Sequence, residues 1–275
     1  MLVHFSKMEC LGQDFMVMDA VTEKIFPVAE KIQKWAQRCT GVGFSEFALV
    51  EPPYDPDTDF YFRVFSDTGQ ERQLSGHASL AMGRFVRDRR LINRPSIRAG
   101  YNGGIIALDV ADENVISVNM GRPVYDPIRL GFKTKKQEKT YILENGKSGI
   151  LVSVVGLPEV HVVVESREIT SADITGIGKS LSASERFTEV PAIDFMEIVN
   201  NHELVFRGYR HNKGECASSG TGGVASALVG VMHKTLESPV KINCSSGTEE
   251  VVITADGSVS LSAQVNFVFS GMVEI

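Results

Sequence analysis

The feature that most constrains the fold is a repeated segment in which serine and glycine open a helical pattern. Ser75-Gly-His-Ala-Ser-Leu-Ala-Met-Gly83 resembles Ser219-Gly-Thr-Gly-Gly-Val-Ala-Ser-Ala227. The two segments lie 144 residues apart (219 − 75), about half of the 275-residue chain. Such a spacing predicts two copies of one structural unit, each with strands wrapped around a central helix.

Two prolines in Gly121–Pro127 interrupt the pattern and place the boundary between the copies. We expect an N-terminal domain over 1–120, completed by a C-terminal strand at 265–275, and a second domain over 121–264. Helical periodicity is clearest in three segments: Val28–Arg38, Ser75–Arg90 and Ser219–His233. Strand-like runs dominate elsewhere: Phe60–Phe65, Ile150–Gly156, Val160–Glu165, Glu249–Thr254, Val259–Gln264 and Gly271–Ile275. Few helices among many strands indicate an α+β fold of two pseudo-symmetric domains, each a mostly antiparallel sheet rolled around a helix.

Composition and charge argue against several classes of partner and location. The formal net charge is −6 and the basic residues are scattered, which argues against nucleic-acid binding. The longest weakly polar run, 217–232, is shorter than the roughly 18 apolar residues of a membrane span. The N-terminus shows no signal-peptide pattern. The four cysteines are dispersed and show no metal-ligand spacing, so we expect a cytoplasmic protein with reduced thiols and no metal site.

Each serine at a helix start is suited to cap a backbone N–H, and the glycine after it permits close approach of another group. The helix dipole adds partial positive charge there. Two matched starts that face each other would grip one carboxylate from either side, which favours a small acidic or amino-acid-like ligand. Each start taken alone is also an ordinary N-cap.

Several motifs resemble those of the diaminopimelate epimerase family, in order and over nearly the whole chain. They are Phe5–Ala20, Gly41–Phe44, Val50–Pro56, Val118–Gly121, Ser184–Phe187 and Gly214-Glu215. The resemblance implies two similar domains with the site in the cleft between them. It also implies cofactor-independent proton transfer and a homodimer.

The family's two catalytic cysteines correspond to Ser75 and Ser219. A serine hydroxyl is a far weaker acid than a thiol, so it does not readily supply the anionic base that a thiolate provides. Cys216, three residues before Ser219, is either a displaced thiol or an inert small residue. Two alternatives remain for these serines: they are natural, or they were introduced in place of cysteines.

The positions that grip substrate in the family also differ. Gln13 and Ser66 stand where the family has asparagines, and Glu159 stands where it has a histidine. Arg210 replaces an acid, which reverses the charge expected to meet a substrate ammonium. Several such losses in one site should abolish recognition of diaminopimelate.

Two segments resemble the phenazine-biosynthesis isomerase family instead. Phe44–Val50 contains Glu46 at the position of that family's acid/base, and Gly76-His77 resembles its substrate-binding segment. Gly220-Thr221 resembles its Gly-Ser pair. Alternatively, Glu46 is a solvated carboxylate at a strand start, and His77 is a helix residue bonded to backbone.

We therefore expect a cofactor-independent isomerase acting on a small amino acid or carboxylate. Glu46 would be the leading proton-transfer group, beside His77, and Ser75 and Ser219 would be the two helix starts that bind the carboxylate. The substrate-binding set would comprise Gln13, Ser66, Gly76, His77, Glu159, Arg210, Cys216, Gly220 and Thr221. An elimination or dehydration enzyme and a non-catalytic binding protein are the alternatives.

Overall fold

The computed structural model describes residues 1–110, 112, 115–146, 148–211 and 213–275. Within these residues the chain forms four helices and 18 strands and divides into two compact units. Unit 1 comprises Met1–Asn119 and Ser262–Ile275, and unit 2 comprises Met120–Leu261. The sequence placed these boundaries at 120 and 265. The part described has no helix long and apolar enough to cross a membrane.

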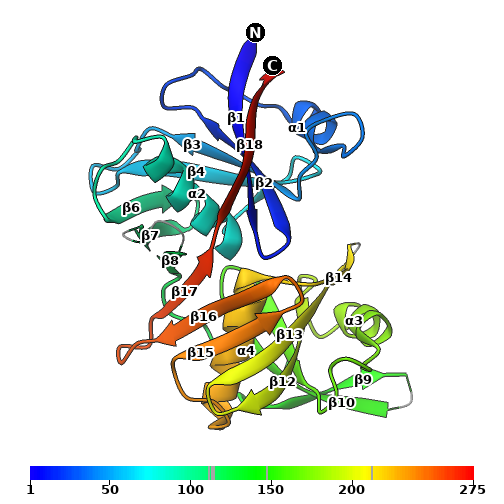
Figure 1. The fold of residues 1–275 in the computed structure, drawn as a ribbon. Coiled ribbons are helices and arrows are strands. Elements are labelled where there is room, and N and C mark those ends of the chain that lie inside the picture. The colour runs from blue at the N-terminus through cyan, green and yellow to red at the C-terminus, as the bar shows by residue number, and fades with distance from the viewer. Residues whose placement is uncertain (111, 113–114, 147, 212) are drawn as a thin grey trace. The chain divides into compact units, whose positions relative to one another are not determined.

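Unit 1 contains two helices and nine strands of its own, drawn in Figure 1. In chain order they are β1 (Leu2–Cys10), β2 (Gln13–Asp19), α1 (Ala29–Ala36), β3 (Glu46–Glu51), β4 (Phe60–Ser66), β5 (Glu71–Arg72), α2 (Gly76–Asp88), β6 (Ser96–Tyr101), β7 (Gly104–Asp109), β8 (Val115–Asn119) and β18 (Asn266–Glu274). The helix α2 is central to the unit: it packs against β1, β2 and β8, and ten of its side chains from Gly76 to Val86 are buried.

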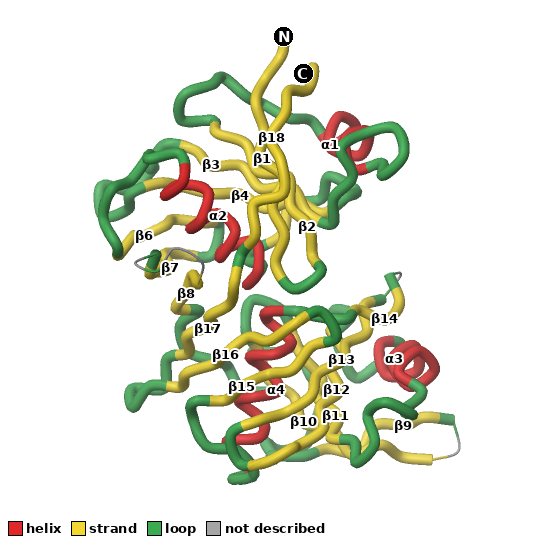
Figure 2. The backbone as a smooth tube through the Cα atoms, viewed as in Figure 1, coloured by secondary structure: helices red, strands yellow, loops and turns green. Residues whose placement is uncertain are grey.

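Unit 2 repeats this plan (Figure 2). Its elements are β9 (Tyr141–Asn145), β10 (Ser148–Gly156), β11 (Val160–Glu165), α3 (Ile174–Ser182), β12 (Ala192–Asn200), β13 (Glu203–Arg210), β14 (Gly214–Cys216), α4 (Gly220–His233), β15 (Val240–Cys244) and β16 (Gly247–Ile253). The strand β17 (Val259–Gln264) contains the boundary with unit 1. The central helix is α4, which packs against β11, β12 and β16 and is buried from Gly220 to Gly230.

The strand pairings of the two units follow the same order. In unit 1, β1 is antiparallel to β2, β2 parallel to β3, β3 antiparallel to β4, and β4 antiparallel to β5 and parallel to β6. In unit 2 the same relations hold for β10, β11, β12, β13, β14 and β15. The internal repeat seen in sequence is therefore a repeat of topology.

This order defines equivalent residues. The first pair of the parallel ladder is Phe15–Glu46 in unit 1 and His161–Ala192 in unit 2. Two residues before Phe15 and His161 lie Gln13 and Glu159, which are therefore equivalent. Two residues after Glu46 and Ala192 lie Ala48 and Asp194, which are equivalent as well. The 144-residue offset of the helix starts also relates Ser66 to Arg210 and His77 to Thr221.

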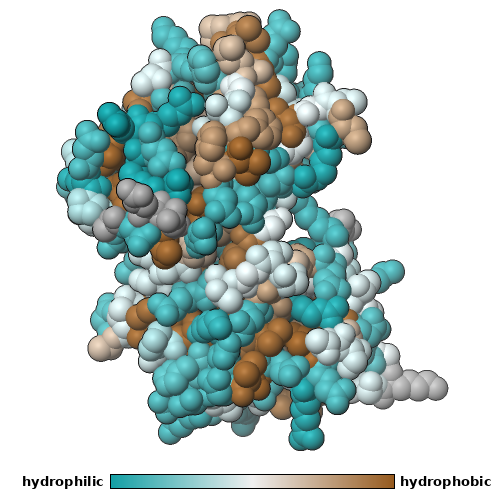
Figure 3. All heavy atoms as spheres, viewed as in Figure 1, coloured by the Kyte–Doolittle hydropathy of each residue, from teal (hydrophilic) through white to brown (hydrophobic). Residues whose placement is uncertain are grey.

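Separate apolar cores hold the units. In unit 1, Trp35 of α1 packs in a core with Phe47 and Phe65, and in unit 2 Leu181 of α3 packs with Ile193 and Phe195. Both apolar and polar side chains cover the face seen in Figure 3. The last strand shows the largest apolar exposure of any strand described, with Phe267, Val268, Phe269 and Met272 each between 43% and 56% exposed.

Secondary structure corrects the sequence expectations at several points. The first helix covers Ala29–Ala36 rather than Val28–Arg38, and the last strand is Asn266–Glu274 rather than Gly271–Ile275. The helix α3, Ile174–Ser182, was not expected. Its glycines Gly176 and Gly178 weaken the intrinsic helix preference, but Asp173 caps its first turn through the Gly176 N–H at 2.8 Å.

Candidate functional site

Ser75 and Ser219 are the N-caps of α2 and α4, as the repeat predicted. At the α2 start, Ser75 Oγ–H donates to Glu46 Oε2 at 2.7 Å, and Ser75 Oγ accepts from the Ala78 N–H at 3.4 Å. Glu46 is buried, with 6% of its surface exposed, and its Oε1 lies 3.4 Å from Arg72 Nε. A carboxylate offers about four acceptor positions, so these contacts do not exhaust it. Glu46 is thus a shielded carboxylate at a helix N-terminus and not a solvated one.

A second acid, Asp14, holds the backbone just before β3 through hydrogen bonds from Ser45. Asp14 Oδ1 accepts from both the backbone N–H of Ser45 (2.9 Å) and the Ser45 hydroxyl (2.7 Å). Lys7 and Arg38 pair with the same carboxylate at 2.6 and 2.9 Å. Burial alone would raise the pKa of Asp14, but the hydrogen bonds from Arg38, Lys7 and Ser45 hold it well below its usual value. This anchored acid holds Glu46 in register beside Phe15.

The other predicted residues of unit 1 divide into two groups. Gly76 and His77 open α2, and His77 Nδ1 lies 2.8 Å from Gln13 Oε1 with the imidazole fully buried. Gln13, His77, Ser75 and Glu46 therefore come together around the α2 start. The Ser66 hydroxyl instead bonds Thr68 Oγ1 at 2.7 Å within a turn, although its backbone pairs with Glu46.

The start of α4 carries a different set of contacts. Arg210 Nη2 donates to Ser219 Oγ at 2.7 Å, and the Gly222 N–H donates to the same oxygen at 3.2 Å. Arg210 Nη1 donates to Asp194 Oδ1 at 2.9 Å, and Asp194 Oδ2 lies 2.6 Å from His161 Nδ1. Asp194 and His161 are both fully buried. A chain of four polar side chains thus leads from the helix start into the interior of unit 2.

Charge pairing stabilises this chain. Burial alone would raise the pKa of the Asp194 carboxyl, but the charge of Arg210 and the hydrogen bonds to it hold that pKa below its usual value. Burial alone would lower the pKa of Arg210, but the negative charge of Asp194 raises it. The positive charge that the sequence places at position 210 is therefore paired within unit 2, with the buried carboxylate of Asp194. Gly222 permits the approach, because a Cβ there would lie 2.5 Å from Asp194 Oδ1.

Glu159 and Thr221 meet on the other side of the same helix start. Thr221 Oγ1 donates to Glu159 Oε1 at 3.1 Å, the counterpart of the contact between His77 and Gln13 in unit 1. Gly220 is the first residue of α4. Cys216 lies at the end of β14, paired with Gly208. Burial raises the pKa of the Cys216 thiol even though Arg210 lowers it, which argues against a displaced catalytic thiolate.

Three polar residues at these helix starts were missed in the sequence: Arg72, His161 and Asp194. The signal for the last two was a single polar residue inside a buried apolar strand, as in Ile193-Asp194-Phe195. Within the described ranges, no three His, Cys, Asp or Glu side chains gather as metal ligands would.

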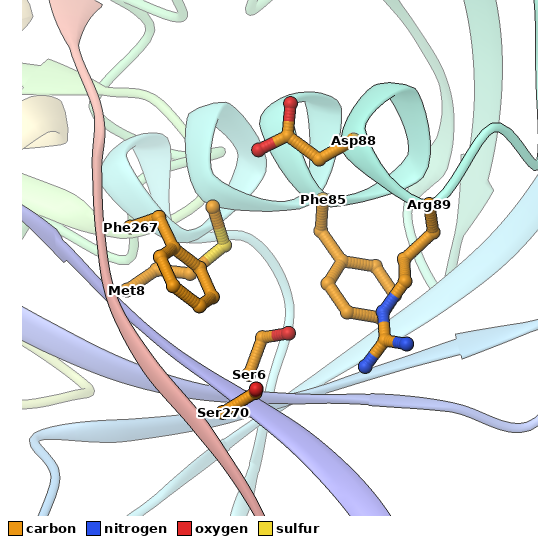
Figure 4. Close-up of a pocket in the computed structure, with 7 residues that line it drawn as sticks. All are labelled: Ser6, Met8, Phe85, Asp88, Arg89, Phe267 and Ser270. Carbon is orange, nitrogen blue, oxygen red and sulfur yellow. The ribbon is translucent and has the colours of Figure 1, made fainter.

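A cavity of about 320 Å³ lies in unit 1 at the other end of α2 (Figure 4). Its lining residues are Ser6, Met8, Phe85, Asp88, Arg89, Phe267 and Ser270. Arg89 lies beside the Phe85 ring, 5.6 Å from its centroid, as the close-up shows. Asp88 is the last residue of α2, about 20 Å along the helix from Ser75. None of the predicted site residues lines this cavity.

The two helix starts differ in what their serines can do with a proton. Ser75 donates its hydroxyl hydrogen to Glu46, so the acidic group beside it is an acceptor. Ser219 accepts two hydrogen bonds, from a cation and from a helix N–H, and its own hydroxyl lies 3.4 Å from the Thr221 hydroxyl. Positive charge at Arg210 and at the helix start stabilises developing negative charge on that oxygen.

No family model matches the chain. Solved structures with the same fold include a probable proline racemase from Agrobacterium radiobacter with bound carbonate, at TM-score 0.75 and 13% identity, covering 99% of this chain and 93% of that one. A phenazine biosynthesis protein of the PhzF family from Bacillus anthracis matches at TM-score 0.67 and 15% identity over 100% of both chains. A methylitaconate-delta-isomerase matches at TM-score 0.66 and 16% identity over 99% of this chain and 95% of that one.

These identities are low, so the likeness is one of fold. It confirms the α+β class and the two-unit plan that the motifs implied. This chain has the fold shared by the probable proline racemase, the PhzF-family protein and the methylitaconate-delta-isomerase.

Proposed function

We propose that this protein is a cofactor-independent isomerase that moves a proton on a small carboxylate or amino acid. The observation that carries the proposal is the buried Glu46 carboxylate, bonded to the Ser75 hydroxyl at 2.7 Å at the N-terminus of a buried helix. A shielded carboxylate beside a positive helix end suits removal of a proton from carbon, because developing charge on the substrate is stabilised close by.

In the proposed reaction Glu46 takes a proton from the carbon next to the substrate carboxylate. The C–H electron pair becomes an enolate-like charge, which the backbone N–H groups at the α2 start stabilise. The protonated Glu46 then returns the proton to carbon, so that no proton is consumed. His77 and Gln13, joined at 2.8 Å, border the same helix start and orient the ligand.

The solved structures support the choice of reaction class. Those of the same fold include proteins named as a racemase and an isomerase, and the racemase holds carbonate, a small planar anion. We extend that chemistry to this chain because its α2 start combines an anion-binding helix end with an acid.

Solvent exchange tests the proposal directly. The protein is incubated in deuterated water with single amino acids and with small saturated and unsaturated carboxylates, and recovered substrate is analysed by NMR and mass spectrometry. Deuterium in recovered or isomerised substrate supports an isomerase. Loss of water or another β-substituent identifies the elimination enzyme instead. Binding without exchange, detected by thermal shift, identifies a ligand-binding protein and defeats the proposal.

Assembly and location belong to the same proposal. We propose a homodimer that acts on a small-molecule substrate without a cofactor, as the resemblance implies, and that works in the cytoplasm, as its dispersed cysteines favour. Analytical ultracentrifugation at several protein concentrations should give the mass of two chains of 30.1 kDa. A single-chain mass throughout would remove the dimer from the proposal and leave the chemistry untouched.

A further inference from the structure

The buried polar chain of unit 2 has no counterpart in unit 1. His161 and Asp194 are equivalent to Phe15 and Ala48, which are fully buried apolar residues. The repeat therefore shows that the fold is satisfied with apolar side chains at these two positions. Burying charged groups costs free energy that pairing recovers only in part. We expect such a network to be retained for what it does at the α4 start.

The network leaves one buried acceptor facing that start. A carboxylate only accepts hydrogen bonds, so His161 Nδ1 carries the proton that Asp194 Oδ2 receives at 2.6 Å. In the neutral ring Nε2 then keeps its lone pair. His161 Nε2 is fully buried and makes no hydrogen bond with the described residues. Its nearest ionisable neighbour is Glu159 Oε1, at 3.8 Å.

Glu159 adds a negative charge beside His161 Nε2. Its carboxylate accepts from the Thr221 hydroxyl at 3.1 Å, and its side chain is 41% exposed, so solvent reaches Glu159 itself. The equivalent residue in unit 1 is the neutral Gln13, which faces a histidine ring instead of an orphaned acceptor. A ligand carboxylate would be repelled by Glu159, whereas a cation with N–H donors would satisfy both acceptors.

We propose that unit 2 binds the ammonium group of an amino-acid substrate between His161 Nε2 and Glu159 Oε1. A hydrogen bond to nitrogen spans about 2.9 Å, so one ligand nitrogen reaches both atoms across their 3.8 Å separation. Asp194 fixes the tautomer of His161, and Arg210 balances the charge of Asp194. This inference rests on the proposed isomerase function and narrows its substrate class from carboxylates to amino acids with a free amine.

Matched ligand pairs test the assignment. The probes are proline with tetrahydrofuran-2-carboxylate, which replaces the ring N–H₂⁺ by oxygen, and alanine with propionate, which lacks the amine. Binding to the whole protein is measured by calorimetry and NMR at millimolar ligand. At least one amine should bind about tenfold more tightly than its partner, because a charge-assisted hydrogen bond is stronger than a neutral one. Equal binding within the pairs, or no binding of either amine, overturns the inference.

Two variants on one strand provide the control. Glu159→Gln keeps the size of the side chain and removes its charge, and it should erase the preference for the amine. Glu165→Gln makes the same change at the exposed end of β11 and should leave the preference intact. A preference that survives Glu159→Gln, or falls equally in both variants, contradicts the proposal.

Histidine nitrogen NMR gives a readout that does not depend on catalysis. The free protein should show His161 with its proton on Nδ1 and a bare Nε2, and the Nε2 signal should move when the amine binds but not when its partner is added. A proton on Nε2 in the free protein would overturn the inference. Amine binding here without any proton exchange would defeat the isomerase proposal and leave this subsite standing.

Discussion

Arg210 donates a hydrogen bond to Ser219 across 2.7 Å, and this bond separates two helix starts that the sequence makes look alike. The equivalent serine, Ser75, meets the carboxylate of Glu46 at the same distance. One serine is therefore a donor to an anion and the other an acceptor from a cation. The two halves of the repeat share a topology and differ in the charge of the side chain that meets the serine at the helix start.

Replacement of Glu46 tests its role in proton transfer. Glu46→Gln keeps an oxygen for the Ser75 hydroxyl to donate to, so the fold should persist, but the amide cannot accept a proton from carbon. We expect proton exchange on an active substrate to fall by roughly 10²–10⁴-fold. Glu71→Gln, which changes a partly exposed acid on β5, should retain the rate. Near-full exchange in Glu46→Gln would assign the chemistry to another group.

The Asp194 network predicts a larger loss of stability for partial than for complete replacement. Asp194→Asn leaves Arg210 without its anion and should lower the free energy of unfolding by about 3–5 kcal/mol in urea denaturation.

The control replaces the whole network by the residues that unit 1 carries at the equivalent positions. The triple change His161→Phe, Asp194→Ala and Arg210→Ser should be less destabilising than Asp194→Asn alone, because no buried charge is left unpaired. If the triple variant is the less stable of the two, the network stabilises the fold by more than charge balance.

Acid stability should depend on Asp14. Its pKa in the folded protein lies below the unfolded value of about 3.9, so its ionised form stabilises the fold. That contribution is complete above the unfolded pKa and is lost as the pH falls through the folded pKa. Asp14→Asn should therefore lower stability at neutral pH and flatten the loss below about pH 4. The same change at exposed Asp57 should leave the pH profile of unfolding unaltered.

Thiol labelling separates the partly buried Cys216 from the exposed Cys39. The thiolate is the reactive form, and burial raises the pKa of Cys216 above its usual value. Iodoacetamide at neutral pH should modify Cys39 first, and the labelling rate of Cys216 should be lower by about tenfold or more. Peptide mapping by mass spectrometry measures both rates. Preferential labelling of Cys216 would instead support the alternative that Cys216 is a displaced catalytic thiol at the α4 start.

Diaminopimelate should not be a substrate. The purified protein should epimerise it negligibly, as followed by NMR in deuterated water. Ser75→Cys combined with Ser219→Cys should not restore the activity, because Arg210 would still face the second thiol and Glu159 would still border it. Robust turnover by either protein contradicts the view that several altered contacts abolish recognition.

The local signals in the sequence were reliable where structure depends on neighbours along the chain. Ser75 and Ser219 were expected at helix starts because a serine cap acts within three residues, and both cap their helices. The strand Val160–Glu165 was expected with its observed bounds. The helix α3 was missed because its two glycines obscure a short pattern, and its apolar side is fixed by packing on β13 and β9.

The sequence by itself determined that two copies of one α+β unit are present and that each central helix opens at a serine. Caps, turns and strand patterns are short-range, so they can be read without knowing the fold. The partners of those serines were decided by tertiary structure alone. Glu46 reaches Ser75 across 29 residues, and His161 reaches Asp194 across 33, because the parallel ladders set their register. Folding then brought His161 and Asp194, single polar residues in apolar strands, into one buried hydrogen-bonded network with Arg210.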